Sequence, residues 1–159
     1  MENSTFKLNK GDNAPQFQLT DSVGKNFSFS EAFKEGSSLL FIFCHGTDCD
    51  VCLRQLPEIE ENLARFEDRG LRPVVITDKP VDYNRELKED LGLSFSILSD
   101  DGTVAEQYGV VENDKIKTAM LIVDRHGMID WTYVGQCEPN PDWPTLEYIF
   151  RHMVMAKGV

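Results

Sequence analysis

The sequence predicts an α/β domain in which helices cover both faces of a mixed central sheet. Segments patterned as strands alternate along the chain with segments of helical spacing, the order that produces such sheets. Residues 38–44 are almost uniformly apolar, as expected for a central strand buried on both faces. The chain has 159 residues, of which 41% are hydrophobic and 27% charged. This length and composition suit a single globular domain.

The first residues, 1–10, are mostly polar, and we interpret them as an arm before a domain that spans residues 11–159. Apolar residues alternate on either side of the turn pair Gly24 and Lys25; they are Phe17, Leu19, Phe27 and Phe29. This pattern predicts an N-terminal β-hairpin. Ser30 is placed to cap a short helical turn that ends at Phe33.

A long helix is predicted after the central strand. Its apolar residues recur at helical spacing as Leu56, Ile59, Leu63 and Phe66, and Gly70 is a suitable residue to end it after Arg69. Pro57 removes one backbone donor, so we expect a kink near the first turns. The patterns then predict strands at 73–77, 95–98, 118–124 and 128–134, and helices at 80–91, 101–108 and from 142 onward.

The segment from Cys44 to Cys52 joins the central strand to this helix and carries the main functional signal. It ends in Cys49-x-x-Cys52 at the predicted helix start. Sites in open α/β sheets lie beyond the carboxyl ends of strands. A helix N-terminus favours negative charge and therefore a thiolate, and two cysteines at this spacing can close a disulfide. We expect both sulfurs to lie at a solvent-accessible helix tip.

Net charge and cysteine usage exclude several function classes. A formal charge of −11 argues against nucleic-acid partners, which require clustered Lys and Arg, and against an anionic membrane surface. The sequence shows neither a membrane-spanning stretch nor an apolar leader segment, so we expect a cytoplasmic protein. Four cysteines in that reducing compartment indicate catalysis or metal binding rather than structural disulfides.

A metal centre is the main alternative explanation of these thiols. The residues that could supply ligands are Cys44, His45, Cys49, Cys52 and Cys137. We expect no bound metal or cofactor. Cys44 ends an apolar strand and is expected to be a buried core thiol.

Two further motifs resemble the peroxiredoxins, the alkyl hydroperoxide reductase/thiol-specific antioxidant family. The first motif opens the domain, and the second resembles the late β-hairpin of the family. They read Gly11-Asp12-x-Ala14-Pro15-x-Phe17-x-Leu19-x-Asp21-x-x-Gly24-Lys25 and Leu121-Ile122-Val123-Asp124-x-x-Gly127-x-Ile129. The order of elements and the place of the Cys-x-x-Cys pair resemble the thioredoxin fold. The resemblance extends from about Gly11 to Phe150.

This resemblance implies an antioxidant oxidoreductase that reduces hydrogen peroxide or organic hydroperoxides through a redox-active disulfide. Cys49 and Cys52 would be its peroxidatic and resolving thiols. The peroxidatic cysteine of the family aligns with Cys52, and the family's threonine three residues earlier aligns with Cys49. A thioredoxin-like mechanism instead selects Cys49 as the attacking thiol. Which of the two cysteines attacks first therefore stays open. The expected reductant is a thioredoxin-like protein, and dimers are common among similar proteins.

Other residues take supporting roles by the same resemblance. The arginine that supports the thiolate in the family aligns near Thr118, where this chain carries Lys117 beside it. His45 and Thr47 are expected to line the pocket, and Cys137 is a candidate additional thiol. Two alternative functions stay open: a thiol–disulfide oxidoreductase acting on protein disulfides, and a non-catalytic redox sensor.

Overall fold

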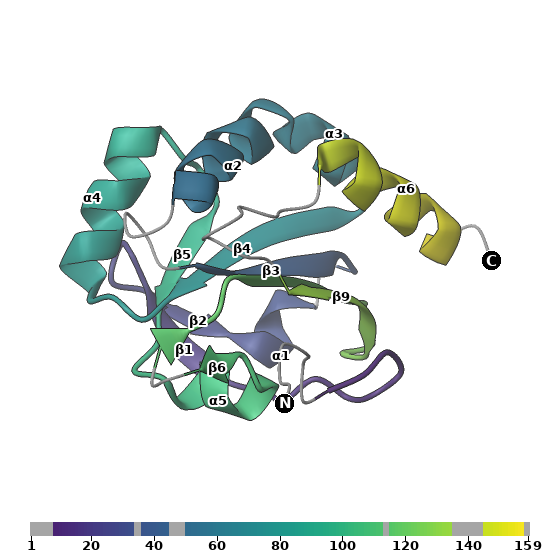
Figure 1. Cartoon of the computed structure of the whole chain (residues 1–159), viewed down its shortest axis with the longest axis horizontal. Helices are drawn as coiled ribbons and strands as arrows, with labels where there is room; N and C mark the ends of the chain where they lie inside the picture. The colour runs from purple at the N-terminus through teal and green to yellow at the C-terminus, as the bar shows by residue number, and fades with distance from the viewer. Residues whose placement is uncertain (1–7, 34–35, 45–49, 113–114, 135–144, 158–159) are drawn as a thin grey trace.

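The predicted sheet, with helices on both faces, is present in the computed structural model of the chain (Figure 1). The structure describes residues 8–33, 36–44, 50–112, 115–134 and 145–157. Within these ranges, seven strands form one mixed sheet in the order β2-β1-β5-β4-β3-β8-β9. These strands are β1 (Gln18–Asp21), β2 (Asn26–Ser28), β3 (Ser38–Cys44), β4 (Leu71–Thr77), β5 (Ser96–Ser99), β8 (Ala119–Val123) and β9 (Ile129–Val134).

The central strand β3 is buried along almost its whole length, as its apolar sequence predicts. It pairs in parallel with β4 and antiparallel with β8, and β4 pairs in parallel with β5. The register places Cys44 beside Thr77 and Thr77 beside Ser99. The carboxyl ends of three parallel strands therefore meet at one edge of the sheet, where sites in such sheets are found.

Two separate apolar cores cover the two faces of the sheet. Alternate residues of β3 divide between them, because successive side chains of a strand point to opposite faces. One core receives Leu40, Ile42 and Cys44, and packs against α2 (Asp50–Glu61), α3 (Leu63–Asp68), α4 (Val81–Leu91) and α6 (Leu146–Lys157). We call it the cysteine face. The other receives Leu39, Phe41 and Phe43, and packs against α1 (Phe29–Ala32) and α5 (Thr103–Tyr108). We call it the aromatic face.

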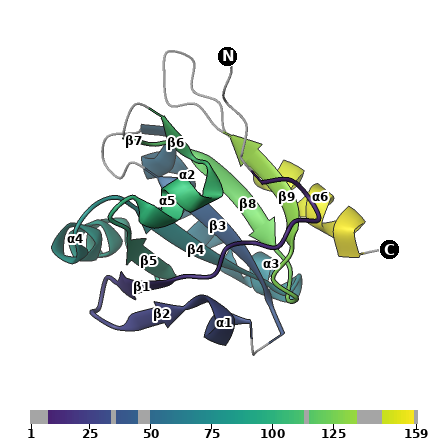
Figure 2. The ribbon, with the colours of Figure 1, turned by 90° about the horizontal axis from the view of Figure 1, so that it is seen from below.

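The N-terminal hairpin forms as predicted, with Leu19 opposite Phe27. Strand β1 also pairs antiparallel with β5, which joins the hairpin to the main sheet (Figure 2). The chain before β1 crosses to the turn between β8 and β9. The amides of Gly11 and Ala14 donate there to the carbonyls of Ile129 and Gly127, at 2.8 and 2.9 Å.

The long helix predicted after the cysteines is divided into two helices, at a residue that was not predicted to end it. Pro57 lies within α2, and the break occurs at Asn62, between α2 and α3. Asn62 has φ −112° and ψ 20°, and its side-chain amide donates to the carbonyl of Glu58 at 2.8 Å. Asparagine competes with helical hydrogen bonds in this way, and this local effect ends α2. Gly70 follows α3 with φ +70°, in agreement with the predicted C-cap.

Element boundaries differ elsewhere by a few residues. Helix α5 starts at Thr103 rather than at 101, and β4 starts two residues before Pro73. A two-stranded ladder of β6 (Val111–Glu112) and β7 (Lys115–Ile116) was not predicted. Strands of two residues are too short to show the alternation of apolar and polar residues that identifies a strand. The predicted start of the last helix, 142–144, lies outside the described residues. Among those described, no helix is both long and apolar enough to cross a membrane.

Candidate functional site

The candidate site lies where β3 ends and α2 begins. Cys44 is the last residue of β3, and Cys52 lies in the first turn of α2. The loop between them, residues 45–49, is outside the described part of the chain. The predicted site residues His45, Thr47 and Cys49 fall in it, and Cys137 also lies outside the described ranges. Cys44 and Cys52 both carry reduced thiols.

Cys52 is more deeply buried than the sequence predicted. Only 1% of its surface is exposed, and Cys44 is fully buried. The core expectation for Cys44 is confirmed, whereas the expectation of a solvent-accessible Cys52 at the helix tip is wrong. The reason is the helical period. Cys52, Leu56 and Ile59 recur at the spacing of one helix face, and all three are buried in the core of the cysteine face.

Thr118 and Lys117 lie at the same edge of the sheet as the end of β3. Phe43 pairs with Ala119, so Thr118, which directly precedes β8, lies beside the end of β3. Thr118 is buried and Lys117 half-buried. The backbone amide of Lys117 donates to the carbonyl of Val110 at 2.7 Å, which holds this segment against the end of α5. The fold thus brings two of the predicted supporting residues to the edge that carries Cys44.

A buried polar network at this edge was not predicted. The hydroxyl of Thr77 donates to the side-chain carbonyl of Asn84 at 2.8 Å, and the amide of Asn84 donates to the hydroxyl of Ser99 at 2.8 Å. Asn84 is fully buried, and it connects α4 to the ends of β4 and β5. The burial of Asn84 could have been predicted from its spacing, because Asn84 and Leu87 lie on the same buried face of α4.

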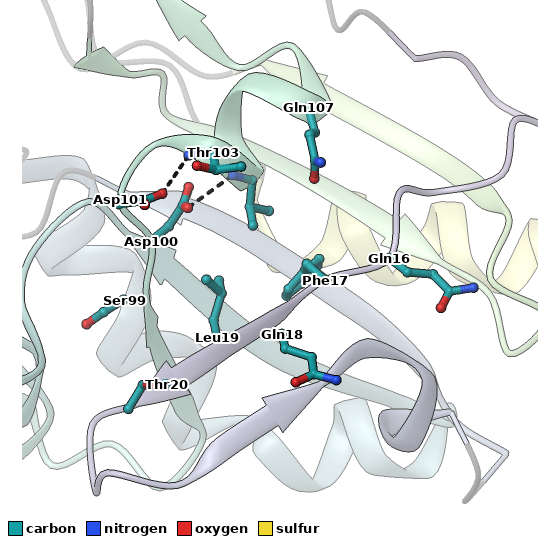
Figure 3. Close-up of a pocket in the computed structure, with 11 residues that line it drawn as sticks. Gln16, Phe17, Gln18, Leu19, Thr20, Ser99, Asp100, Asp101, Thr103 and Gln107 are labelled. Atoms are coloured by element: carbon teal, nitrogen blue, oxygen red, sulfur yellow. Dashed lines mark hydrogen bonds between the residues drawn. The ribbon is translucent and has the colours of Figure 1, made fainter.

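A groove of about 480 Å³ lies elsewhere, between β1 and the start of α5 (Figure 3). Its lining residues are Gln16, Phe17, Gln18, Leu19, Thr20, Ser99, Asp100, Asp101, Thr103, Val104 and Gln107. Hydrogen bonds from the side chain and amide of Thr103 hold the pKa of Asp101 below its usual value. Asp100 accepts the amides of Val104 and Ala105 at 3.0 and 2.9 Å. These carboxylates are occupied in holding α5, and no thiol lines the groove.

The described residues contain no group of three or more His, Cys, Asp or Glu side chains arranged to hold a metal ion. His45, Cys49 and Cys137 lie outside the described ranges. The chemistry that the described site offers is that of the Cys52 thiol. It lies at the N-terminal end of a helix, where unpaired amides favour a thiolate.

Comparison with known proteins identifies the family. A family model described as "AhpC/TSA family" matches residues 10–132. The chain therefore belongs to the AhpC/TSA family. Its relatives include chloroplastic peroxiredoxin Q of Oryza sativa subsp. japonica, which is 26% identical over 138 residues, or 84% of this chain and 63% of the relative. The chain thus spans a little under two thirds of the length of that relative.

Solved structures agree with this fold. The peroxidoxin BcpB from Mycobacterium tuberculosis superposes with a TM-score of 0.77 at 19% identity, covering 94% of this chain and 97% of the other. The mitochondrial 2-cys peroxiredoxin from Plasmodium falciparum gives 0.80 at 17% identity, covering 94% and 98%. The predicted thioredoxin-like fold of peroxiredoxin type is confirmed over nearly the whole chain.

Proposed function

We propose that the protein is a thiol-dependent peroxidase that reduces hydrogen peroxide or organic hydroperoxides through a Cys49/Cys52 redox cycle. The observation that carries this proposal is the position of Cys52. A cysteine lies in the first turn of a helix at the carboxyl end of a central strand, in a chain that belongs to the AhpC/TSA family. The peroxiredoxin names of its relatives support the same reaction.

The reaction balances with the residues available. The Cys52 thiolate attacks the O–O bond of the peroxide and takes one oxygen as a sulfenic acid, and the other oxygen leaves as water or an alcohol. The thiol of Cys49 then condenses with the sulfenic acid, which forms the S–S bond and releases water. A dithiol reductant reopens the disulfide by exchange. We propose a thioredoxin-like protein as that reductant, and no bound cofactor is required.

The burial of Cys52 limits which oxidants can reach it. A sulfur with 1% exposure is accessible to a small molecule after a small movement, whereas a protein disulfide requires a fully exposed thiol. We therefore expect hydrogen peroxide to react faster than a bulky hydroperoxide such as cumene hydroperoxide. Equal rate constants for the two oxidants would mean that access to Cys52 is not limiting.

Residues at the neighbouring edge are proposed to support the thiolate. Thr118 and Lys117 lie beside the end of β3, and a lysine ammonium near this edge would favour the negative sulfur. His45 and Thr47, on the loop before Cys49, are proposed to line the peroxide pocket. Cys137 is proposed as an additional thiol. We also propose a cytoplasmic location and a homodimer as the working assembly.

A thiol–disulfide oxidoreductase is the second candidate. The Cys-x-x-Cys spacing together with the burial of Cys52 favours it, because the buried cysteine of such a pair resolves while the first cysteine attacks. In that function Cys49 would attack a protein disulfide, and peroxide would not be needed. Insulin reduction that is lost in Cys49→Ser, in a protein that consumes no peroxide, would favour this candidate.

The test measures peroxide consumption by the reduced full chain, coupled to thioredoxin, thioredoxin reductase and NADPH. We expect Cys52→Ser to abolish turnover. Cys49→Ser should still consume at least one equivalent of peroxide, because the first attack does not need Cys49. Glu58→Gln, an exposed change on the same helix, is the matched control and should turn over like the wild type. Turnover that survives in Cys52→Ser would refute the assigned role of Cys52.

A further inference from the structure

Cys44 is a second buried thiol that the proposed cycle does not use. It is the last residue of β3 and is fully buried. Leu40, Ile42 and Cys44 point to the same face of the sheet and belong to one core. That is the face on which α2 lies (Figure 1). The end of the central strand therefore directs a thiol toward the helix that carries Cys52.

Cys52 belongs to the same core as Cys44, but it lies on the helix that covers the sheet. It shares the buried face of α2 with Leu56 and Ile59, and it belongs to the same contiguous cluster as Cys44. The two elements are consecutive in the chain, joined through residues 45–49. The carboxyl end of β3 and the first turn of α2 thus bring two thiols into one core at the same edge of the sheet.

The surroundings of the two thiols restrict their chemistry. The other buried members of this apolar cluster are aliphatic and aromatic side chains and the thioether of Met120, and the buried Thr77 and Thr118 lie at the same edge of the sheet. The described residues hold no metal-binding group. A disulfide is uncharged, so this largely apolar core can hold one. Within the described core, a sulfenic acid on Cys52 therefore has one thiol available to it, that of Cys44.

We propose that Cys44 is a second resolving thiol, which closes a disulfide with oxidised Cys52. This inference rests on the proposed peroxidase function, in which peroxide supplies the oxidation. The sulfur of Cys44 attacks the sulfenic sulfur of Cys52, the S–S bond forms, and the hydroxyl leaves with the thiol proton as water. A dithiol reductant then restores both thiols. Cys52 thus has two partners, Cys49 by sequence spacing and Cys44 through the core.

Closure requires the two Cα atoms to come within about 4.4–6.8 Å. The first turn of α2 is the part that can adjust, because the first amides of a helix have no intrahelical partner. Cys44 lies in a strand paired on both sides and is held in place. We therefore expect the disulfide to form by movement of the helix start toward the strand.

The chain contains four cysteines, so the double variant Cys49→Ser/Cys137→Ser keeps only Cys44 and Cys52. We oxidise this variant with hydrogen peroxide and measure its intact mass under non-reducing conditions. The expected product is a monomer that has lost the mass of two hydrogen atoms. The inference would be overturned if Cys52 accumulated as a sulfenic or sulfinic acid while Cys44 could still be alkylated after unfolding. It would also be overturned if peroxide left both thiols of the variant reduced.

The matched control adds Cys44→Ala to the same background. It should trap the Cys52 sulfenic acid, detected as a dimedone adduct, and proceed to sulfinic acid. Cys44→Ser serves the same purpose if the alanine variant does not fold by circular dichroism. In the peroxide-treated wild type, proteolytic cleavage before Asp48 and Asp50 places Cys44, Cys49 and Cys52 on separate peptides. We expect to find peptides linked through Cys44–Cys52 as well as peptides linked through Cys49–Cys52. Their absence there would also count against the inference.

The two proposals fail in different ways. If the wild type consumes no peroxide, the peroxidase function itself is wrong. If the wild type turns over but the double variant forms no Cys44–Cys52 disulfide, only the role of Cys44 is wrong.

Discussion

The two faces of the central sheet differ in the side chains that β3 contributes to them. On the aromatic face, Phe41 and Phe43 of β3 pack with Tyr108 at ring distances of 6.4 and 5.7 Å, and Phe17 lies 5.6 Å from Phe41. On the cysteine face, β3 ends in Cys44 opposite the helix of Cys52. To the first face β3 contributes aromatic rings. To the second it contributes Leu40, Ile42 and the Cys44 thiol, and the rings there, such as Phe66 and Phe150, come from other elements.

This difference shows how the fold separates stability from chemistry. Aromatic rings bury large areas and prefer fixed mutual geometry, so the aromatic face is suited to hold the sheet rigid. Sulfur is small and adaptable, and a helix start can shift without breaking the core. We expect substitutions on the aromatic face to change the free energy of unfolding, and substitutions on the cysteine face to change thiol reactivity as well.

The largest effect is expected from Phe41→Ala. Phe41 is fully buried, and deleting such a ring costs about 3–5 kcal/mol through lost burial and a residual cavity. Urea unfolding measures the loss. In the protein that remains folded, peroxide oxidation of Cys52 should keep its wild-type rate constant. The separation of the two faces would be broken if that rate constant changed together with stability.

Ile42→Val tests the same idea from the next residue, which points to the cysteine face. We expect a smaller loss of about 0.5–1.5 kcal/mol. The loosened core should also raise the rate of Cys52 alkylation by iodoacetamide, because Cys52 becomes exposed more often. An alkylation rate equal to that of the wild type would mean that the apolar core does not control access to the thiol.

Asn84→Ala removes the polar network that joins α4 to the ends of β4 and β5. The hydroxyls of Thr77 and Ser99 each lose a bond of 2.8 Å, while Thr77 keeps the bond from the amide of Lys79 at 3.1 Å. The two lost bonds together cost about 1–3 kcal/mol. Chemical denaturation checks this value. Glu86→Ala, an exposed change on the same helix, is the control and should change stability by less than about 0.5 kcal/mol. Equal effects of the two variants would contradict the structural role of Asn84.

Tyr108→Phe is expected to have a small effect at neutral pH, similar in size to that of Ile42→Val. The hydroxyl of Tyr108 donates to the carbonyl of Pro15 at 2.7 Å, and losing one such bond costs about 0.5–1.5 kcal/mol. Burial raises the pKa of Tyr108 above its ordinary value of 10.0. The folded state therefore keeps the phenol protonated where the unfolded chain releases the proton.

This raised pKa has a defined consequence for stability. The contribution of Tyr108 is fully present below pH 10 and falls as the pH rises above 10, because the unfolded state then binds fewer protons. The wild type should lose stability over this alkaline range more steeply than Tyr108→Phe. Parallel stability curves for the two proteins above pH 10 would contradict the burial argument.

Much of the fold was readable from local pattern. The hairpin around Gly24, the buried strand 38–44 and the helix stop at Gly70 were all predicted, because each depends on residues adjacent in sequence. The helix break at Asn62 was missed. The side chain of Asn62 donates to the carbonyl of Glu58 there, and whether an asparagine continues a helix or ends it is not determined by its residue type alone. The Thr77–Asn84–Ser99 network was also missed, since it joins three separate elements.

The sequence by itself determined the alternation of strands and helices, and with it the position of Cys52 at a helix start after a central strand. These features follow from side-chain period and from backbone preferences of single residues. The helical period that Cys52 shares with Leu56 and Ile59 also determined that Cys52 lies on the buried face of its helix. Only the tertiary structure decided that Cys44 shares the core of Cys52. Which strand residue lies across from a helix depends on packing between elements, and no local pattern encodes that contact.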